Sequence, residues 1–208
     1  MFPLGTVLLP YAHLPLHIFE PRDRALIKDV LAGSGEFGVV LIERGHEVGG
    51  GDARFAVGTV ARVVQTAELP DGRWLVDAVG TERFRVTEWL PEDPYPQALV
   101  EPVEDDPDDE TAGPEAQADA AQRRNAVERV LRQVLALQVE LGFPAPSAVR
   151  SLDDDPATAA FEAALLSPIG PMDAQKVLEA PGTVARLALL ESLLDEVREL
   201  LARRIAEN

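Results

Sequence analysis

The sequence predicts an α+β fold, in which an N-terminal β-barrel with one helix precedes a C-terminal α-helical bundle. Short β-rich runs separated by proline and glycine fill residues 1–103. An acidic, proline-containing stretch follows at 104–119, and apolar residues then recur with helical spacing to residue 208. We therefore expect a β-domain over 1–103, an acidic linker over 104–119 and a helical bundle over 120–208.

The β-domain is predicted from its β-forming runs and the turn residues between them. The Asp71-Gly72 pair lies between two such runs and predicts a tight hairpin. Pro10 and Pro15 indicate that the first two runs lie at sheet edges or bends. Many short strands with close turns favour a small barrel or folded sheet over a layered α/β fold. The predicted strands are Val7–Leu9, Leu14–Phe19, Phe37–Glu43, Phe55–Ala67, Arg73–Val79, Phe84–Leu90 and Gln97–Val103.

One helix is predicted inside the β-domain, over Arg22–Ala32. Pro21 suits the first helical position, and Gly33 suits the position just after the last turn. Gly33, Gly35 and Gly38 also match the G-x-G-x-x-G spacing of dinucleotide-binding loops. That motif follows a strand and opens a helix, whereas here it follows a helix and opens a strand. We therefore interpret these glycines as a helix end and a turn.

The acidic stretch contains carboxylates and no Lys or Arg, so it is expected to be a mobile, solvated linker. Beyond it, two apolar stripes with alternating three- and four-residue spacing predict two long helices that suit packing against each other. Asp155-Pro156 predicts the start of a helix that ends near Leu166. A shorter helix is expected over Asp173–Glu179. The stripes are Val127, Val130, Val134, Leu137 and Leu141, and Leu187, Leu190, Leu194, Val197 and Leu201.

Composition limits the partners and the compartment that we expect. The formal net charge of -17 opposes binding to nucleic acid and to anionic lipid. The chain has no cysteine, which excludes disulfides and thiolate metal sites. It has no apolar run long enough to span a membrane and no basic N-terminal region typical of a signal peptide. We therefore expect a cytoplasmic protein with no nucleic-acid or membrane partner.

No catalytic, cofactor or metal site is predicted. A phosphate-binding loop needs Gly-Lys-Ser/Thr, and neither Lys28 nor Lys176 follows a glycine. His13 and His17 are spaced as metal ligands on a helix would be, but Pro15 between them favours an extended segment. The acidic residues of the linker lack the glycine and spacing of a calcium loop.

An ordered set of motifs gives the β-domain a family resemblance. The motifs resemble the N-terminal, substrate-binding domain of the Lon protease family, which implies a PUA-like β-barrel, a helical bundle after it, and recognition of unfolded substrates. In that family an ATPase and a Ser-Lys peptidase follow, whereas this sequence ends at Asn208, so it looks like the stand-alone relatives. The matching glycines and prolines are expected to form turns. The motifs are Phe2–Gly5, Leu14–Pro21, Val57–Ala61, Leu69–Gly72, and Val79-Gly80 leading into Arg83–Arg85.

We predict a non-catalytic module, not an enzyme, whose partner is an unfolded or extended polypeptide. Arginine and aromatic residues are frequent anchors of protein interfaces. The Leu14–Phe19 segment adds a candidate edge that could pair with an extended chain. The candidate peptide-binding residues are His17, Phe19, Arg62, Trp74, Arg83, Arg85, Trp89 and Tyr95.

Two alternatives remain open. The apolar stripes could pair between chains, which would make the protein a homodimer or a homo-oligomeric assembly or adaptor protein. An enzyme that acts on a small ligand has the least support, because no convergent acid, base and nucleophile is visible in the sequence.

Overall fold

The computed structural model describes residues 1–45, 53–106, 113–147 and 151–207. The chain forms two compact units, Met1–Val103 and Glu104–Asn208. The first unit contains the strands and one helix, and the second contains the remaining helices. This arrangement confirms the predicted α+β fold with a C-terminal helical region.

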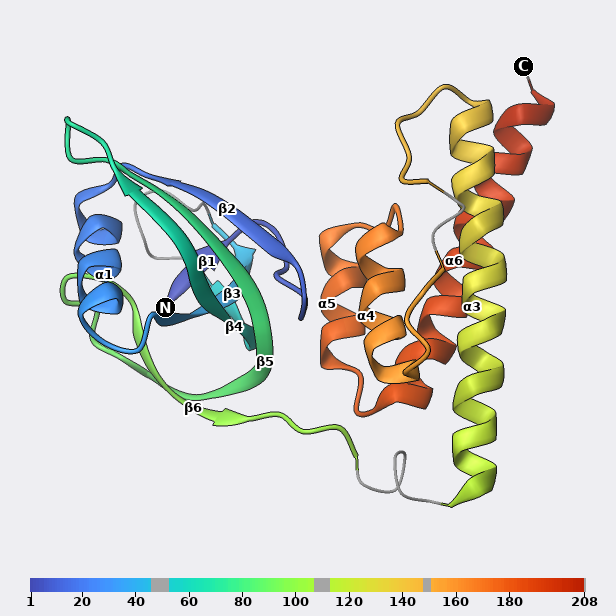
Figure 1. Ribbon diagram of the computed structural model, residues 1–208, viewed down its shortest axis with the longest axis horizontal. Helices are drawn as coiled ribbons and strands as arrows, with labels where there is room; N and C mark the ends of the chain where they lie inside the picture. The colour runs from blue at the N-terminus through green and yellow to red at the C-terminus, as the bar shows by residue number, and fades with distance from the viewer. Residues whose placement is uncertain (46–52, 107–112, 148–150, 208) are drawn as a thin grey trace. The chain divides into compact units, whose positions relative to one another are not determined.

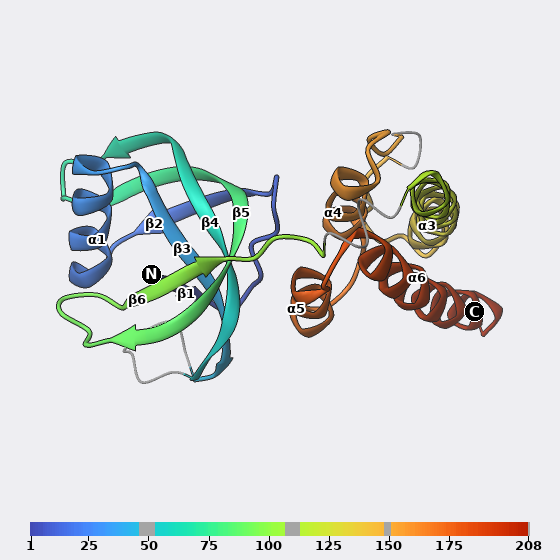
Figure 2. The same cartoon turned by 90° about the horizontal axis from the view of Figure 1, so that it is seen from below.

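The N-terminal unit is a six-stranded mixed sheet with one helix beside it (Figures 1 and 2). The strands follow the order β1-β3-β4-β5-β2, and β6 also pairs with β5. Among the strand pairs of the described residues, β1–β3 alone is parallel. The elements are β1 (Phe2–Leu4), β2 (His13–Ile18), α1 (Pro21–Ala32), β3 (Glu36–Arg44), β4 (Ala53–Glu68), β5 (Trp74–Leu90) and β6 (Gln97–Pro102).

The sheet curls so that its two ends, β1 and β2, line the same cleft together with the start of α1. This closure gives the unit its barrel-like form. Leu26 and Ile27 of α1 are buried in the core of the unit, where they join Val39, Val76 and Ala78 from the strands. Apolar residues on one face of α1 therefore fix the helix against the barrel.

Two glycines that were expected to form turns lie inside strands instead. A Cβ on Gly58 would collide with the Val39 carbonyl oxygen, and one on Gly80 would collide with the Leu9 carbonyl oxygen. These glycines allow the backbones to approach closely. Gly72, by contrast, has φ +79° in the turn between β4 and β5, as the Asp71-Gly72 pair predicts.

The strand predictions were wrong at two places. Val7–Leu9 is not a strand; Leu8 and Leu9 are buried there, and the Thr59 hydroxyl donates a 2.6 Å hydrogen bond to the Leu8 carbonyl. The first strand is Phe2–Leu4. The runs Arg73–Val79 and Phe84–Leu90 form one strand, because Gly80 continues it.

Helix α1 ends at Ala32, directly before Gly33, as predicted. The Gly33 N–H caps the helix on the Val30 carbonyl, but the positive φ, +75°, falls on Gly35. The glycines lie between helix α1 and strand β3, which is the reverse of a dinucleotide-binding loop.

The C-terminal unit contains α3 (Pro114–Glu140), α4 (Pro156–Leu166), α5 (Pro171–Glu179) and α6 (Thr183–Ala206). Helices α3 and α6 pack along each other, and α4 packs on both (Figure 1). Asp155 caps α4 as predicted, because its carboxylate accepts a 2.9 Å hydrogen bond from Thr158 N–H. Both predicted stripes contribute buried residues within the one chain: Val127, Val130 and Val134 on α3, and Leu187, Leu190, Leu194 and Leu201 on α6.

The predicted linker is partly structured, and residues 107–112 within it lie outside the described part of the chain. Helix α3 already begins at Pro114. Before the gap, the Asp105 carboxylate accepts hydrogen bonds of 3.1 and 2.6 Å from the two Nη atoms of Arg186. The Arg186 side chain is fully buried and stacks over Phe161. Asp105 therefore belongs to the helical unit instead of a solvated linker.

Candidate peptide-binding surface

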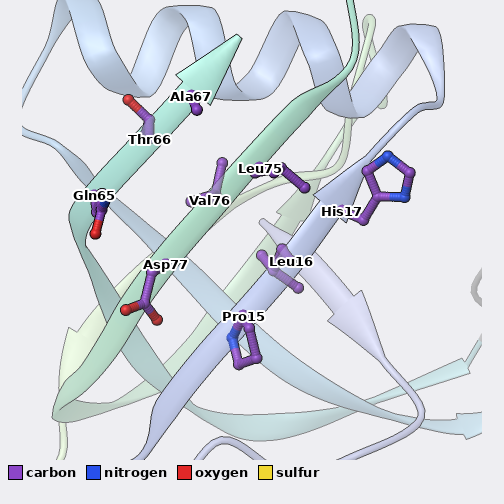
Figure 3. A pocket seen from close by; sticks show the side chains of 9 residues that line it. All are labelled: Pro15, Leu16, His17, Gln65, Thr66, Ala67, Leu75, Val76 and Asp77. Atoms are coloured by element: carbon purple, nitrogen blue, oxygen red, sulfur yellow. The ribbon is translucent and has the colours of Figure 1, made fainter. Parts of the chain in front are cut away.

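An apolar groove lies over three adjacent strands of the N-terminal unit, β2, β5 and β4. Two cross-strand rows build it: His17 pairs with Leu75, which pairs with Ala67, and Pro15 pairs with Asp77, which pairs with Gln65. Figure 3 shows these side chains gathered from the three strands around one hollow. The groove has a volume of about 430 Å³. This size suits one or two apolar side chains of a bound chain.

Leu75 is the main exposed apolar side chain of this groove, with 47% of its surface accessible. Next to it, the His17 ring lies 6.2 Å from the ring of Phe19, which is 55% exposed. Among the described residues that line the groove, Asp77 is the only carboxylate, and its Oδ2 lies 3.6 Å from His13 Nδ1. The groove therefore offers apolar contact along most of its length and a negative charge at one end.

The cleft between β1 and β2 adjoins the groove, since Pro15, Leu16 and His17 line both. Its volume is about 230 Å³, and its polar side is formed by Glu20, Arg22 and Asp23 at the start of α1. Arg22 Nε lies 3.3 Å from Glu20 Oε2. Burial raises the pKa of the Asp23 carboxyl above its ordinary value.

The candidate residues chosen from the sequence do not form one site. Only His17 and Phe19 lie at the groove or its adjoining cleft. Trp74 and Tyr95 are partly buried and pack against the core. The Tyr95 hydroxyl donates a 2.6 Å hydrogen bond to Asp29, which raises the pKa of Tyr95.

The arginine predictions need a correction at Arg83, which is only 6% exposed and cannot present its side chain as a surface anchor. Arg62 is exposed but forms a 2.9 Å ion pair with Glu36. Arg85 is exposed and lies opposite Glu101 on β6. Trp89 is also exposed, and the Arg54 guanidinium stacks 4.7 Å from the centre of its ring. These residues belong to other parts of β4 and β5.

Leu75, Ala67 and Gln65 are groove residues that the sequence reasoning missed. A signal for Leu75 was present, because Trp74, Val76 and Ala78 alternate with Leu75, Asp77 and Val79 along the strand. In that alternation Val76 and Ala78 are buried, so Leu75 is an apolar residue on the outward face. Ala67 pairs with Leu75, and Gln65 pairs with Asp77. The register of these pairs follows from irregularities near Gly80 and Val63 that the sequence does not reveal.

The described residues hold no cluster of histidine, aspartate and glutamate suited to bind a metal ion. Within the same ranges, no helix combines the length and the apolar character needed to cross a membrane.

Comparisons of the sequence with family models and with known proteins agree on the family. The family of the ATP-dependent protease La (LON) substrate-binding domain matches residues 1–196. The chain is 33% identical over 199 residues to Lon protease 2 of Myxococcus xanthus, and 33% identical over 199 residues to a Lon protease of Anaeromyxobacter dehalogenans. Each alignment covers 95% of this chain but 23% of the relative. The chain thus spans about a quarter of the length of these relatives.

Solved structures agree with this result. A Lon N-terminal domain protein from Xanthomonas campestris superposes with a TM-score of 0.59 at 27% identity, over 92% of this chain and 95% of that one. The N-terminal domain of a Mycobacterium avium complex Lon protease gives a TM-score of 0.63 at 19% identity, over 93% and 96%, and supports the fold alone. The resemblance seen in the sequence is confirmed: the chain belongs to the family of the LON substrate-binding domain.

Proposed function

We propose that this protein is a non-catalytic module that binds unfolded or extended polypeptide chains through the groove over β2, β5 and β4. The observation that carries the proposal is the exposed Leu75, which lines an apolar hollow from the middle one of its three strands. Family membership supports it, because the matched family is a substrate-binding domain. The matched family describes the substrate-binding domain alone, and this chain aligns with 23% of the length of its relative from Myxococcus xanthus.

Recognition of this kind depends on apolar contact more than on sequence. An apolar side chain of the bound polypeptide would cover Leu75 and Ala67, and a neighbouring basic residue would lie near Asp77. Covering apolar surface contributes about 25 cal/mol per Å², which gives roughly 1 to 2 kcal/mol for a partly exposed leucine. A folded protein keeps such side chains in its own core, so it would not bind.

The test is fluorescence anisotropy with reduced, carbamidomethylated lysozyme as a permanently unfolded probe. Native lysozyme is the control, because it has the same sequence and a similar charge but is folded. We expect saturable binding of the unfolded probe only. Equal binding of both forms would instead indicate nonspecific attraction of a basic protein to a chain of net charge -17.

The groove is tested with Leu75→Gln, and Leu31→Gln on α1 is the matched control. Both leucines are exposed, at 47% and 40%, but Leu31 does not line the groove. We expect Leu75→Gln to weaken probe binding roughly tenfold, as about 1.4 kcal/mol of apolar contact is lost. Leu31→Gln should leave it unchanged. Equal affinity of both variants would rule out the groove.

A further inference from the structure

The outer edge of β6 presents main-chain hydrogen-bonding groups that no described strand uses. Strand β6 pairs with β5 alone among the strands that the structure describes. Val103 N–H donates a 3.0 Å hydrogen bond to the Arg83 carbonyl. In an antiparallel pair the bonded positions alternate. The groups of Glu101 and Leu99 therefore face β5, whereas those of Ala98 and Val100 face outward.

The edge of β2 is less suited to the same task. Gly80 N–H donates a 2.9 Å hydrogen bond to the Ala12 carbonyl. Alternation from that pair turns the main-chain groups of His13, Pro15 and His17 toward the free edge. Pro15 has no N–H, so a donor is missing in the middle of this edge. The mode expected from the sequence, pairing along Leu14–Phe19, would lose a hydrogen bond at that point.

Exposed apolar side chains accompany the open edge of β6. Leu99 is 52% exposed and Val100 is 48% exposed, and successive residues of a strand point to opposite faces. Trp89 lies opposite Ala98 on β5 and is 36% exposed. A strand added beside Ala98 and Val100 would thus gain apolar contacts on both of its faces. Proteins commonly protect such edges with lysine or with proline, and here prolines occur only at the ends, at Pro96 and Pro102.

The charge of the surroundings limits the partner. Glu88 and Glu101 lie on the paired strands near the edge, with Arg85 opposite Glu101 and Arg54 over Trp89, so the repulsion of an acidic segment comes from the net charge of the whole chain, -17. An acidic segment would be repelled, whereas a neutral or basic one would not. The two prolines at the ends of the strand restrict the docked segment to a few residues.

We propose that β6 is a docking edge, at which a short extended segment of the bound polypeptide adds to the sheet as a strand through the main-chain groups of Ala98 and Val100. The inference deepens the proposed function and rests on it: the groove holds side chains, and this edge holds backbone. The segment it takes is rich in β-forming apolar residues and is not acidic. Because the contacts are to the main chain, the edge tolerates many sequences.

Residue-resolved amide hydrogen exchange tests the edge in the intact protein. Without ligand, the amides of Ala98 and Val100 should exchange fast, while the Glu101 amide is protected by its bond to β5. At saturating reduced, carbamidomethylated lysozyme, we expect protection of the Ala98 and Val100 amides. Unchanged exchange at both positions, under conditions where anisotropy shows the probe bound, would overturn the proposal.

The variant Val100→Pro gives an independent test. The Val100 N–H points away from β5, so proline there removes a docking donor and keeps the β5–β6 ladder. We expect roughly five- to tenfold weaker probe binding, because one main-chain hydrogen bond to the docked segment is lost and the hydrogen bond next to it is strained. Val100→Thr keeps the N–H and the branched shape, and should bind as the parent chain does.

The outcomes separate this inference from the proposed function. If Leu75→Gln weakens binding while a folded Val100→Pro variant does not, the groove stands and the β6 edge is refuted. If the unfolded probe does not bind the parent chain at all, the proposed function fails, and the edge fails with it. If Val100→Pro does not fold, the hydrogen-exchange result on the parent chain decides.

Discussion

A buried ion pair anchors the first residues of the helical unit. Arg186 is fully buried, and its Nη2 lies 2.6 Å from Asp105 Oδ1, while the Thr183 hydroxyl donates to Asp105 Oδ2 at 3.1 Å. The Asp105 side chain is itself 13% exposed. Two charges removed from water in this way depend on each other, because either one alone would be left uncompensated.

Asp105→Ala is therefore expected to lower the free energy of unfolding of the helical unit by about 3 kcal/mol. The control is Asp154→Ala, since the Asp154 carboxylate is fully solvent-exposed and its loss changes the charge equally. That control should change stability by less than about 0.5 kcal/mol. Urea unfolding measures both, and similar values for the two variants would show that the buried pair contributes no more than a surface charge.

Strand β4 lies so close to its neighbours at Gly58 that only a glycine fits there. The place of a Cβ on Gly58 is occupied by the Val39 carbonyl oxygen of β3 and by the Phe84 ring of β5. Gly58→Ala should destabilise the barrel unit by about 2 to 3 kcal/mol, because backbone atoms must move apart. Gly170→Ala is a suitable comparison, since nothing lies within 4 Å of its Cβ position. If thermal unfolding shows that the two variants are destabilised equally, the close approach at Gly58 is contradicted.

At the level of elements, local signals predicted more than long-range ones. Pro21, Asp155 and the Asp71-Gly72 turn mark boundaries through chemistry within a few residues, and each boundary lies where it was predicted. A glycine such as Gly80 looks like a turn signal in the sequence. In the structure it is needed because the Leu9 carbonyl, distant in sequence, lies where a Cβ would be. The continuity of β5 and the absence of a strand at Val7–Leu9 therefore could not be read locally.

For the candidate site, too, local signals predicted more than long-range ones. Phe19 and His17 could be predicted because they lie in the Leu14–Phe19 segment, which Pro15 marks as a candidate edge. Leu75 and Ala67 become a groove only when the register of three strands is known. Arg83 carries no signal in the sequence that distinguishes it from Arg85, and burial by the surrounding strands alone separates them.

For the whole molecule, the apolar stripes that suggested a homodimer are largely buried inside one chain, at Val127, Val134, Leu187 and Leu194 among others. Little of that surface remains to join a second copy, and the net charge of -17 opposes self-association. We therefore expect light scattering to give the mass of a monomer, 22.5 kDa, at every concentration tested. A mass that doubles as concentration rises would favour the assembly alternative.

Binding of unfolded chains by the groove is tested most directly by comparing the affinities of the parent chain and of Leu75→Gln for reduced, carbamidomethylated lysozyme, with native lysozyme as the folded control. We predict saturable binding of the unfolded form alone, weakened roughly tenfold by the substitution. Binding of neither form, or binding that Leu75→Gln leaves unchanged, would contradict recognition of unfolded chains by the groove over β2, β5 and β4.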